Sequence, residues 1–184
     1  TAAVEAMVGS LVPAEGGKAL VICNGIYGER MLSMLQMHRK PHVAMQHAWT
    51  EGIRLQELES TLGADRSITH VVAVHHETTT GRLNPVHEFI AICRQRNVRL
   101  LLDAVSSFGG EPLDLSNDSP IDAIASTANK CLHGVPGISF VLTRESAMRR
   151  APSASPCLYL DLHKNFQAQE NGAPLFTPAV QVLA

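Results

Sequence analysis

The sequence lacks the apolar run of about 20 residues that a helix needs to cross a bilayer, so we expect no membrane partner. Positive charge is also not in excess, because 15 Lys and Arg stand against 17 Asp and Glu. This balance excludes the basic footprint of a nucleic-acid-binding protein. The N-terminus lacks the charged and then apolar layout of a signal peptide.

Several motifs for nucleotides, metals and nucleophiles are absent too. There is no G-x-G-x-x-G, G-x-x-x-x-G-K-[ST] or G-x-S-x-G, so dinucleotide, P-loop and nucleophile-elbow chemistry is unsupported. His75 and His76 are adjacent on an extended segment before Glu77, where side chains alternate between faces, so we expect no metal site there. Four cysteines occur without a C-x-x-C pair, which favours reduced thiols in a cytoplasmic protein: Cys23, Cys93, Cys131 and Cys157.

Alternating helix and strand patterns run through the 184 residues, which are enough to bury one sizeable core. Gly63 is a predicted helix stop, and Asn84 a predicted N-cap before Pro85. The pattern predicts an α/β fold with a mainly parallel sheet flanked by helices. The predicted helices are 3–11, 29–38, 54–62 and 85–96, the predicted strands are 18–23, 42–47, 70–75, 98–103, 121–126 and 138–143, and 108–115 is a predicted hairpin or excursion.

Reactive or polar side chains follow the strands. Ligands of such sheets bind outside the carboxyl ends of the strands, so these loops predict one site. Asp103 closes the most apolar strand, and Lys130 follows the next strand among small residues. A carboxylate and an amine at one edge suit pyridoxal phosphate, which needs a lysine for its Schiff base and an acid for its pyridine nitrogen. A lysine must be neutral to attack a carbonyl, and partial burial and nearby cationic groups would lower its pKa and make this possible.

Each of these residues also has an ordinary structural interpretation. Asp103 could stabilise a turn, and Lys130 could be a surface lysine in a loop. Thr1 could cap a helix or cradle a phosphate there. Tyr27 could stack on a flat heterocycle or pack on its own loop. The hydroxyls of residues 78–80 could bind a ligand or satisfy a turn, and these alternatives stay open on the residues alone.

Three stretches identify a family more specifically than the spacing of Asp103 and Lys130 does. They are His-His-Glu-Thr-Thr-Thr-Gly at 75–81, Leu-Asp-Ala-Val-Ser-Ser-Phe-Gly at 102–109, and Thr-Ala-Asn-Lys-Cys-Leu-His-Gly-Val-Pro-Gly at 127–137. Together they resemble the 2-aminoethylphosphonate–pyruvate transaminases, which are class V aminotransferases of the fold type I pyridoxal-phosphate enzymes. Asn-Gly-Ile-Tyr-Gly-Glu-Arg at 24–30 fits as well. The resemblance covers most of residues 1–145 and, more loosely, 176–178.

The resemblance implies roles for the matching positions. Lys130 would be the catalytic residue, carrying the cofactor through its Schiff base and moving the proton between two carbons. Asp103 would bind the pyridine nitrogen, and Tyr27 would stack over the ring. The resemblance also implies cofactor contacts from Thr1 and Thr127 near the phosphate, Thr79 near the phenolic oxygen, Val105, and Thr177.

Thr177 would reach the phosphate of a neighbouring subunit, which implies a homodimer with shared sites. The chain does not begin with Met and ends in an apolar stretch, so we expect a piece of a larger protein. Residues 1–150 would be the pyridoxal-phosphate-binding large domain, truncated at its N-terminus. Residues 151–184 would be a linker and the start of the C-terminal region. The small domain would be missing, with the arginine that the family uses for the acidic group of the substrate.

Three functions remain in competition. The first is transfer of the amino group of 2-aminoethylphosphonate to pyruvate, which gives phosphonoacetaldehyde and alanine in organic phosphonate catabolism. The second is an alanine–glyoxylate or serine–pyruvate type of class V aminotransferase. The threonines at 78–80 and the Cys-Leu-His at 131–133 argue against it. The third is an inactive, truncated α/β domain.

Overall fold

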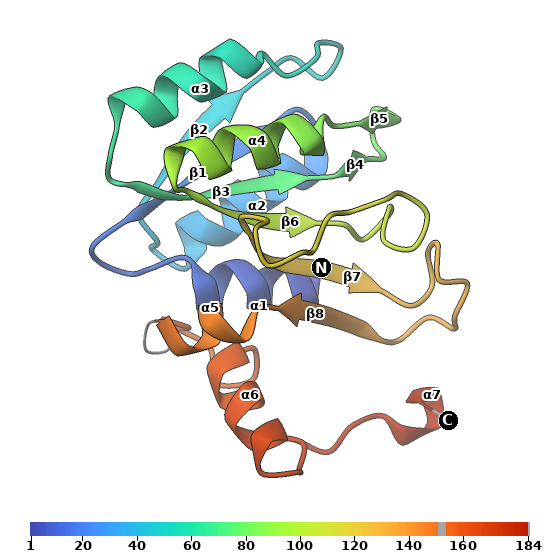
Figure 1. Ribbon diagram of the computed structural model, residues 1–184. Helices are drawn as coiled ribbons and strands as arrows, with labels where there is room; N and C mark the ends of the chain where they lie inside the picture. Colours follow the sequence, from blue (N-terminus) through green and yellow to red (C-terminus); the bar gives the residue numbers. More distant parts are fainter. Residues whose placement is uncertain (151–153, 184) are drawn as a thin grey trace.

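The computed structural model describes residues 1–150 and 154–183, and its centre is a six-stranded sheet (Figure 1). The strands lie in the order β2-β1-β3-β6-β7-β8, and only β8 runs antiparallel to its neighbour. The sheet is therefore mainly parallel, as predicted. Its strands are β1 (Lys18–Cys23), β2 (His42–Gln46), β3 (Ile68–Val74), β6 (Arg99–Asp103), β7 (Ile121–Thr127) and β8 (Ser139–Thr143), and a separate antiparallel pair is formed by β4 (His76–Glu77) and β5 (Arg82–Leu83).

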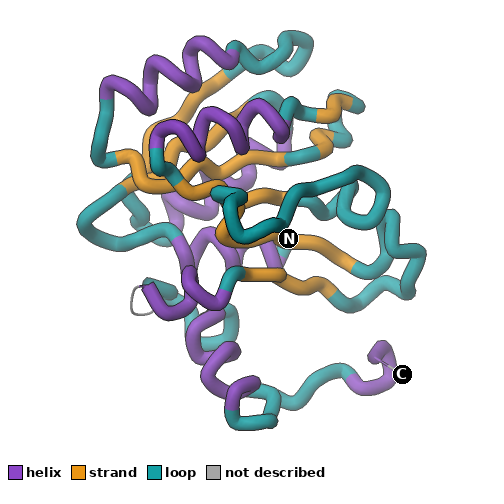
Figure 2. The backbone as a smooth tube through the Cα atoms, viewed as in Figure 1, coloured by secondary structure: helices purple, strands orange, loops and turns teal. Residues whose placement is uncertain are grey.

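Helices cover both faces of this sheet, which confirms the predicted α/β layering (Figure 2). One face packs against α1 (Ala2–Leu11) and α2 (Ile26–Met37), and the other against α3 (Leu55–Ala64) and α4 (Val86–Arg96). Three further helices follow the last strand: α5 (Glu145–Arg150), α6 (Leu162–Glu170) and α7 (Val180–Leu183). No helix in the described ranges is long and apolar enough to span a bilayer.

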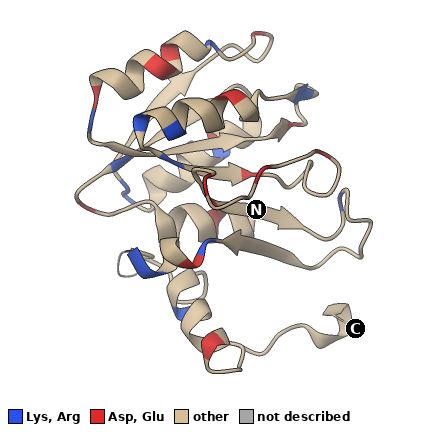
Figure 3. Ribbon diagram, in the orientation of Figure 1, with Lys and Arg blue, Asp and Glu red and all other residues tan. Residues whose placement is uncertain are grey.

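Burial on both faces explains why the strands are continuous apolar runs. In β1, Leu20 and Ile22 join the cluster under α3 and α4, whereas Ala19 and Val21 join the cluster under α1 and α2. Because side chains alternate along a strand, every position of such a strand must be apolar. Figure 3 shows the result, since charged residues gather on helices and loops while the central strands are nearly free of them. Polar chemistry is left to the strand ends.

The order of the strands reverses beside β1. The chain runs from β1 through α2 to the edge strand β2, and then through α3 to β3 on the other side of β1. Ligands of open α/β sheets bind at such a reversal, outside the carboxyl ends of the strands. The loops after β1, β3, β6 and β7 lie along this one edge (Figure 1).

The start of α2 differs from the sequence prediction. The helix begins at Ile26 rather than at residue 29, so Tyr27 lies in its first turn and not in a loop. The backbone N–H groups of Tyr27 and Gly28 donate to the carboxylate of Glu77, 3.1 and 3.3 Å away. A residue about fifty positions away therefore supplies the missing cap, and local sequence carries no sign of it.

Two other local predictions were wrong, and of the two alternatives for residues 108–115 only the excursion holds. Gly63 lies inside α3, which ends one residue later. Pro85, not Asn84, is the N-cap of α4, because the Asn84 side chain is bonded to Asn24 and the end of β3 instead. Residues 108–115 form no hairpin, and the segment contains one isolated bridge, from Phe108 to residue 111. The predicted linker at 151–156 falls partly on residues 151–153, which lie outside the described residues.

Phe89 on α4 offers a test of the packing. Its ring is fully buried, so we expect Phe89→Ala to lower the free energy of unfolding by about 3–5 kcal/mol through lost burial and a residual cavity. Leu83→Ala is the control, because Leu83 is 48% exposed and should cost no more than about 0.5 kcal/mol. Urea unfolding followed by far-UV circular dichroism measures both, and equal losses would contradict the packing described.

Candidate active site

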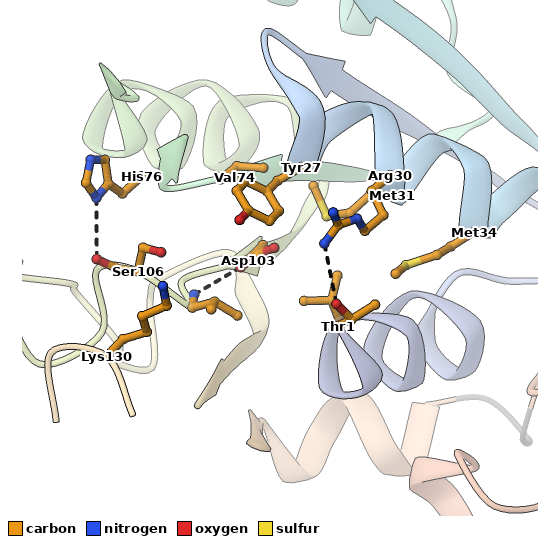
Figure 4. A pocket seen from close by; sticks show the side chains of 12 residues that line it. Thr1, Tyr27, Arg30, Met31, Met34, Val74, His76, Asp103, Ser106 and Lys130 are labelled. Carbon is orange, nitrogen blue, oxygen red and sulfur yellow. Dashed lines mark hydrogen bonds between the residues drawn. The ribbon is translucent and has the colours of Figure 1, made fainter. Parts of the chain in front are cut away.

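A cavity of about 150 Å³ opens at the carboxyl edge of the sheet, between α1, α2 and the ends of β3 and β6 (Figure 4). An apolar cavity of this volume is large enough to bind benzene. The wall is partly apolar and partly polar, as ligand sites usually are. It is lined by Thr1, Val4, Tyr27, Arg30, Met31, Met34, Val74, His76, Asp103, Val105, Ser106 and Lys130.

Five of the predicted site residues meet at this cavity, although each comes from a different part of the chain. Thr1 precedes α1, Tyr27 lies in the first turn of α2, Asp103 ends β6, Val105 follows it, and Lys130 lies in the turns after β7. The parallel sheet brings them together because its strands end at one edge. The structure supports a shared site, and the role of each residue remains a prediction.

Three predicted cofactor contacts lie outside the cavity lining. The Thr79 hydroxyl donates to the carboxylate of Glu77 at 2.6 Å. The Thr127 hydroxyl lies 2.8 Å from the Ile138 carbonyl. Thr177 is exposed on the segment between α6 and α7. Their predicted contacts with a cofactor therefore remain predictions.

Asp103 forms the polar floor of the cavity and is only 6% exposed. Its Oδ1 accepts a hydrogen bond from the Val105 N–H at 2.9 Å, so the turn interpretation is also correct. Among the residues that the structure describes, no donor reaches Oδ2. Burial raises the pKa of this carboxyl to about 6, against the opposing effects of the Val105 N–H and the charge of Arg30. A buried acceptor of this kind fits a cationic donor bound in the cavity.

Lys130 reaches the cavity from the opposite side to α2 (Figure 4). It is exposed, as in the interpretation of a surface lysine, and lacks the partial burial that favours a neutral amine. The reason is local, because residues 129–137 run along the sheet edge and every one of them is exposed. In the described part of the chain no acidic side chain pairs with Lys130. Its amine is therefore available to a ligand.

Sequence reasoning missed seven lining residues, of which three are polar: Arg30, His76 and Ser106. Arg30 places its guanidinium 4.9 Å from the centre of the Tyr27 ring, and its Nη1 lies 3.4 Å from the Thr1 hydroxyl. His76 Nδ1 lies 3.4 Å from the Ser106 carbonyl oxygen. Arg30 could have been found, because it lies three residues after Tyr27 and such residues share a helix face. The signal was hidden by the prediction that Tyr27 sits in a loop.

The adjacent histidines behave differently from one another. His75 is buried, and this burial lowers its pKa, whereas His76 lines the cavity. In residues 1–150 and 154–183 no group of three His, Cys, Asp or Glu side chains is arranged to hold a metal ion. The candidate chemistry of the site is therefore that of a carboxylate, an amine, an aromatic face and a guanidinium.

The family model and the similar proteins agree on one family. The model of the family described as aminotransferase class-V matches residues 1–160. A 2-aminoethylphosphonate–pyruvate transaminase from Burkholderia thailandensis is 42% identical over 185 residues, covering 100% of this chain and 50% of the relative. One from Pseudomonas putida is 37% identical, again over 100% of this chain and 50% of the relative. The chain spans about half the length of the curated relatives it matches.

Solved structures resemble the chain along nearly all of its length. A pyridoxamine–pyruvate aminotransferase from Mesorhizobium loti gives a TM-score of 0.85 at 27% identity, covering 99% of this chain and 47% of that chain. An alanine–glyoxylate aminotransferase from Nostoc sp. gives 0.83 at 27% identity, covering 98% and 48%. The sheet order and its helical layers are therefore shared with solved aminotransferases.

The raised pKa of Asp103 predicts a pH-dependent effect on stability. Its ordinary value is 3.8, so between about pH 4 and pH 6 this carboxyl is protonated to a greater extent in the folded chain than in the unfolded chain. The contribution of Asp103 to the free energy of unfolding of the ligand-free protein then falls as pH rises through this window, whereas that of His70, whose pKa burial lowers to about 4, rises. Asn does not titrate. From pH 4 to pH 7 we therefore expect the free energy of unfolding of Asp103→Asn to rise relative to that of the wild type by up to about 3 kcal/mol.

Urea unfolding at both pH values measures this difference, and comparing the two cancels any pH-independent effect of the substitution. Asp114→Asn is the control of opposite sign, because hydrogen bonds from Ser116 hold the pKa of the exposed Asp114 below its ordinary value. At acidic pH, the free energy of unfolding of the wild type should therefore rise relative to that of Asp114→Asn as pH increases. Parallel pH profiles of the wild type and Asp103→Asn would contradict the assigned environment of Asp103.

Proposed function

The chain belongs to the class-V aminotransferase family, and on that premise we propose that it is the cofactor-binding part of a pyridoxal-phosphate transaminase. One observation carries the proposal. The free oxygen of buried Asp103, the amine of Lys130 and the ring of Tyr27 share a single cavity large enough for a small ring. This is the set of groups that a pyridine aldehyde requires.

Pyridoxal phosphate fits the chemistry of the lining residues. Asp103 would bind its ring nitrogen, since an opposite charge favours the ionised carboxylate and removes the cost of burying it alone. Tyr27 would stack on the ring. The cation of Arg30 and the N-terminal end of α1 beside Thr1 would favour the phosphate. When bound, the cofactor supplies an electron sink for the carbanion that forms at the amine-bearing carbon.

Lys130 would have two tasks in sequence. Its Nζ would first attach the cofactor, and after the substrate amine replaces it, the same Nζ would move the proton between the two reacting carbons. Nζ must be neutral for both tasks. Because Lys130 is exposed in this chain, we propose that bound ligand or further protein covers it and excludes water from it.

We propose 2-aminoethylphosphonate as the amino donor and pyruvate as the acceptor, with phosphonoacetaldehyde and alanine as products. The support is the 37–42% identity with relatives named for that reaction. The structural likeness to an alanine–glyoxylate enzyme is at 27% identity and favours that alternative less. The whole reaction also requires groups outside this chain, since an arginine of the small domain would bind the acidic group of the substrate.

Three further features belong to the same proposal. Residues 1–150 would act as the cofactor-binding domain, and 151–184 would lead into the C-terminal region. The protein would be a homodimer, in which exposed Thr177 serves the site of the neighbouring subunit rather than its own. A cytoplasmic location is supported by four free cysteines, one of which is exposed beside Lys130.

Substitution of Lys130 tests cofactor attachment directly. We expect the protein to gain a visible absorption band on addition of pyridoxal phosphate and to hold it through gel filtration. Lys130→Ala should lose the band, because no other lysine lines the cavity in the described part of the chain. Lys164→Ala is the matched control, since Lys164 is exposed on α6 away from the cavity and should leave the band unchanged.

The amino donor is tested by single-turnover spectroscopy on the cofactor-loaded protein. We expect 2-aminoethylphosphonate to change the visible spectrum of the whole protein, which includes the small-domain arginine, at least about tenfold faster than serine, because a site built to pair with the phosphonate is not satisfied by the differently placed carboxylate of serine. Subsequent addition of pyruvate should restore the spectrum and release alanine. Faster reaction with serine would favour the second type of transaminase instead.

A further inference from the structure

Glu77 is a charged residue that the proposed reaction does not use, yet it is fully buried. Within the described ranges no basic side chain pairs with it. Its Oε2 accepts hydrogen bonds from the N–H groups of Tyr27 and Gly28, at 3.1 and 3.3 Å. Its Oε1 accepts the Thr79 hydroxyl at 2.6 Å. A buried carboxylate is costly unless it is bonded in this way, so the arrangement needs a physical reason.

We propose that Glu77 is a positioning residue, whose carboxylate sets the start of α2 and with it the stacking face of Tyr27 at the cofactor site. The inference rests on the proposed function and deepens it. Glu77 itself does not line the cavity, so it acts through other residues and not by touching the cofactor.

The first step of the argument is the capping of α2. The N-cap residue Gly25 has no side chain to offer, and α2 begins at Ile26. An N-cap side chain ordinarily accepts from the second or third helical N–H, which here belong to Tyr27 and Gly28. Glu77 accepts from both and also places negative charge at the positive end of the helix. The direction in which α2 starts, and with it the Tyr27 ring, therefore depends on this carboxylate.

The second step is the close approach of Gly25. A Cβ at this position would lie 2.3 Å from Glu77 Cγ, so any larger residue would push the Glu77 side chain away. The backbone of Gly25 is extended, which any residue can adopt, so contact and not conformation requires glycine here. Gly25→Ala is consequently a way to displace the Glu77 carboxylate without deleting it.

The third step is the clamp that holds the two segments together. Asn24 Nδ2 donates to Asn84 Oδ1 at 2.7 Å, and Asn84 Nδ2 donates to the Val74 carbonyl at 2.8 Å. Both asparagines are buried. The residue before the cap is thereby tied to the end of β3, three residues ahead of Glu77. The geometry between Glu77 and α2 is thus reinforced from both segments.

A positioning role for Glu77 competes with two simpler roles. Glu77 could merely stabilise the fold, or its charge could act on the site through space, since it contributes to the raised pKa of Asp103. If the role of Glu77 were purely structural, its substitution would lower the free energy of unfolding but leave the affinity of the folded protein for pyridoxal phosphate unchanged. A through-space effect would persist when Tyr27 is removed, whereas a positioning effect would disappear with it.

The test is a double-substitution cycle read by titration of pyridoxal phosphate, at a temperature where every variant is folded. We expect Glu77→Ala to weaken binding by about tenfold or more, but by less than about twofold when Tyr27→Ala is already present. Glu77→Gln keeps an acceptor oxygen for the helix and should weaken binding by no more than about threefold, rescuing most of the loss. Equal losses in both Tyr27 backgrounds, or no loss at all, would overturn the proposal.

Glu88→Ala is the matched control. Glu88 is exposed in the first turn of α4, so the substitution removes the same charge at a helix N-terminus away from the cavity. We expect Glu88→Ala to leave the affinity for pyridoxal phosphate within about twofold of the wild-type value, because substitutions at exposed positions usually have small effects.

A second readout needs no cofactor. Trp49 is the single tryptophan, and its Nε1 donates to Glu29 in the first turn of α2 at 2.8 Å. Its emission should shift in Glu77→Ala and Gly25→Ala, which disturb that turn, and stay unchanged in Glu88→Ala. Unchanged emission in the first two variants would overturn the inference. If the wild type binds no pyridoxal phosphate, the proposed function fails, and this readout still shows whether Glu77 orients α2.

Discussion

Burial of the central sheet on both faces is the constraint from which the rest of the molecule follows. Strands such as β1 face one apolar cluster with odd-numbered residues and another with even-numbered residues. No polar side chain fits there without a cost, so functional groups appear only where strands end. The parallel direction of five strands then gathers those ends along one edge, beside the reversal of strand order at β1 and β3.

Two buried carboxylates at that edge have opposite environments. Glu77 is saturated by backbone and hydroxyl donors, and it holds the start of α2. Asp103 receives one backbone donor and keeps a free oxygen toward the cavity, with its pKa raised by burial. The first arrangement suits a structural anchor. The second suits a group that binds a cationic ligand, because a buried carboxylate with a shifted pKa is typical of binding sites.

Family membership and the cavity support each other without either being sufficient. The family match spans residues 1–160 and points to aminotransferase chemistry, but folds alone do not define reactions. The cavity adds an acid, an amine, an aromatic face and a cation in one place. The side of the cavity at Lys130 is open to solvent, because Lys130 lies in the exposed segment 129–137. Covering that segment would exclude water from the amine.

The sequence by itself determined the sheet, the layers and much of the site. Continuous apolar runs marked the doubly buried strands, and Asp103 and Lys130 stood out because they follow such runs. Only the tertiary structure decided the start of α2, since its cap comes from Glu77 about fifty residues away. The same long-range contact placed Tyr27 and Arg30 on one helix face, and the lack of cover over residues 129–137 left Lys130 exposed. Periodicity is a local property that sequence displays directly, whereas a cap or a cover depends on which distant atoms the fold brings near.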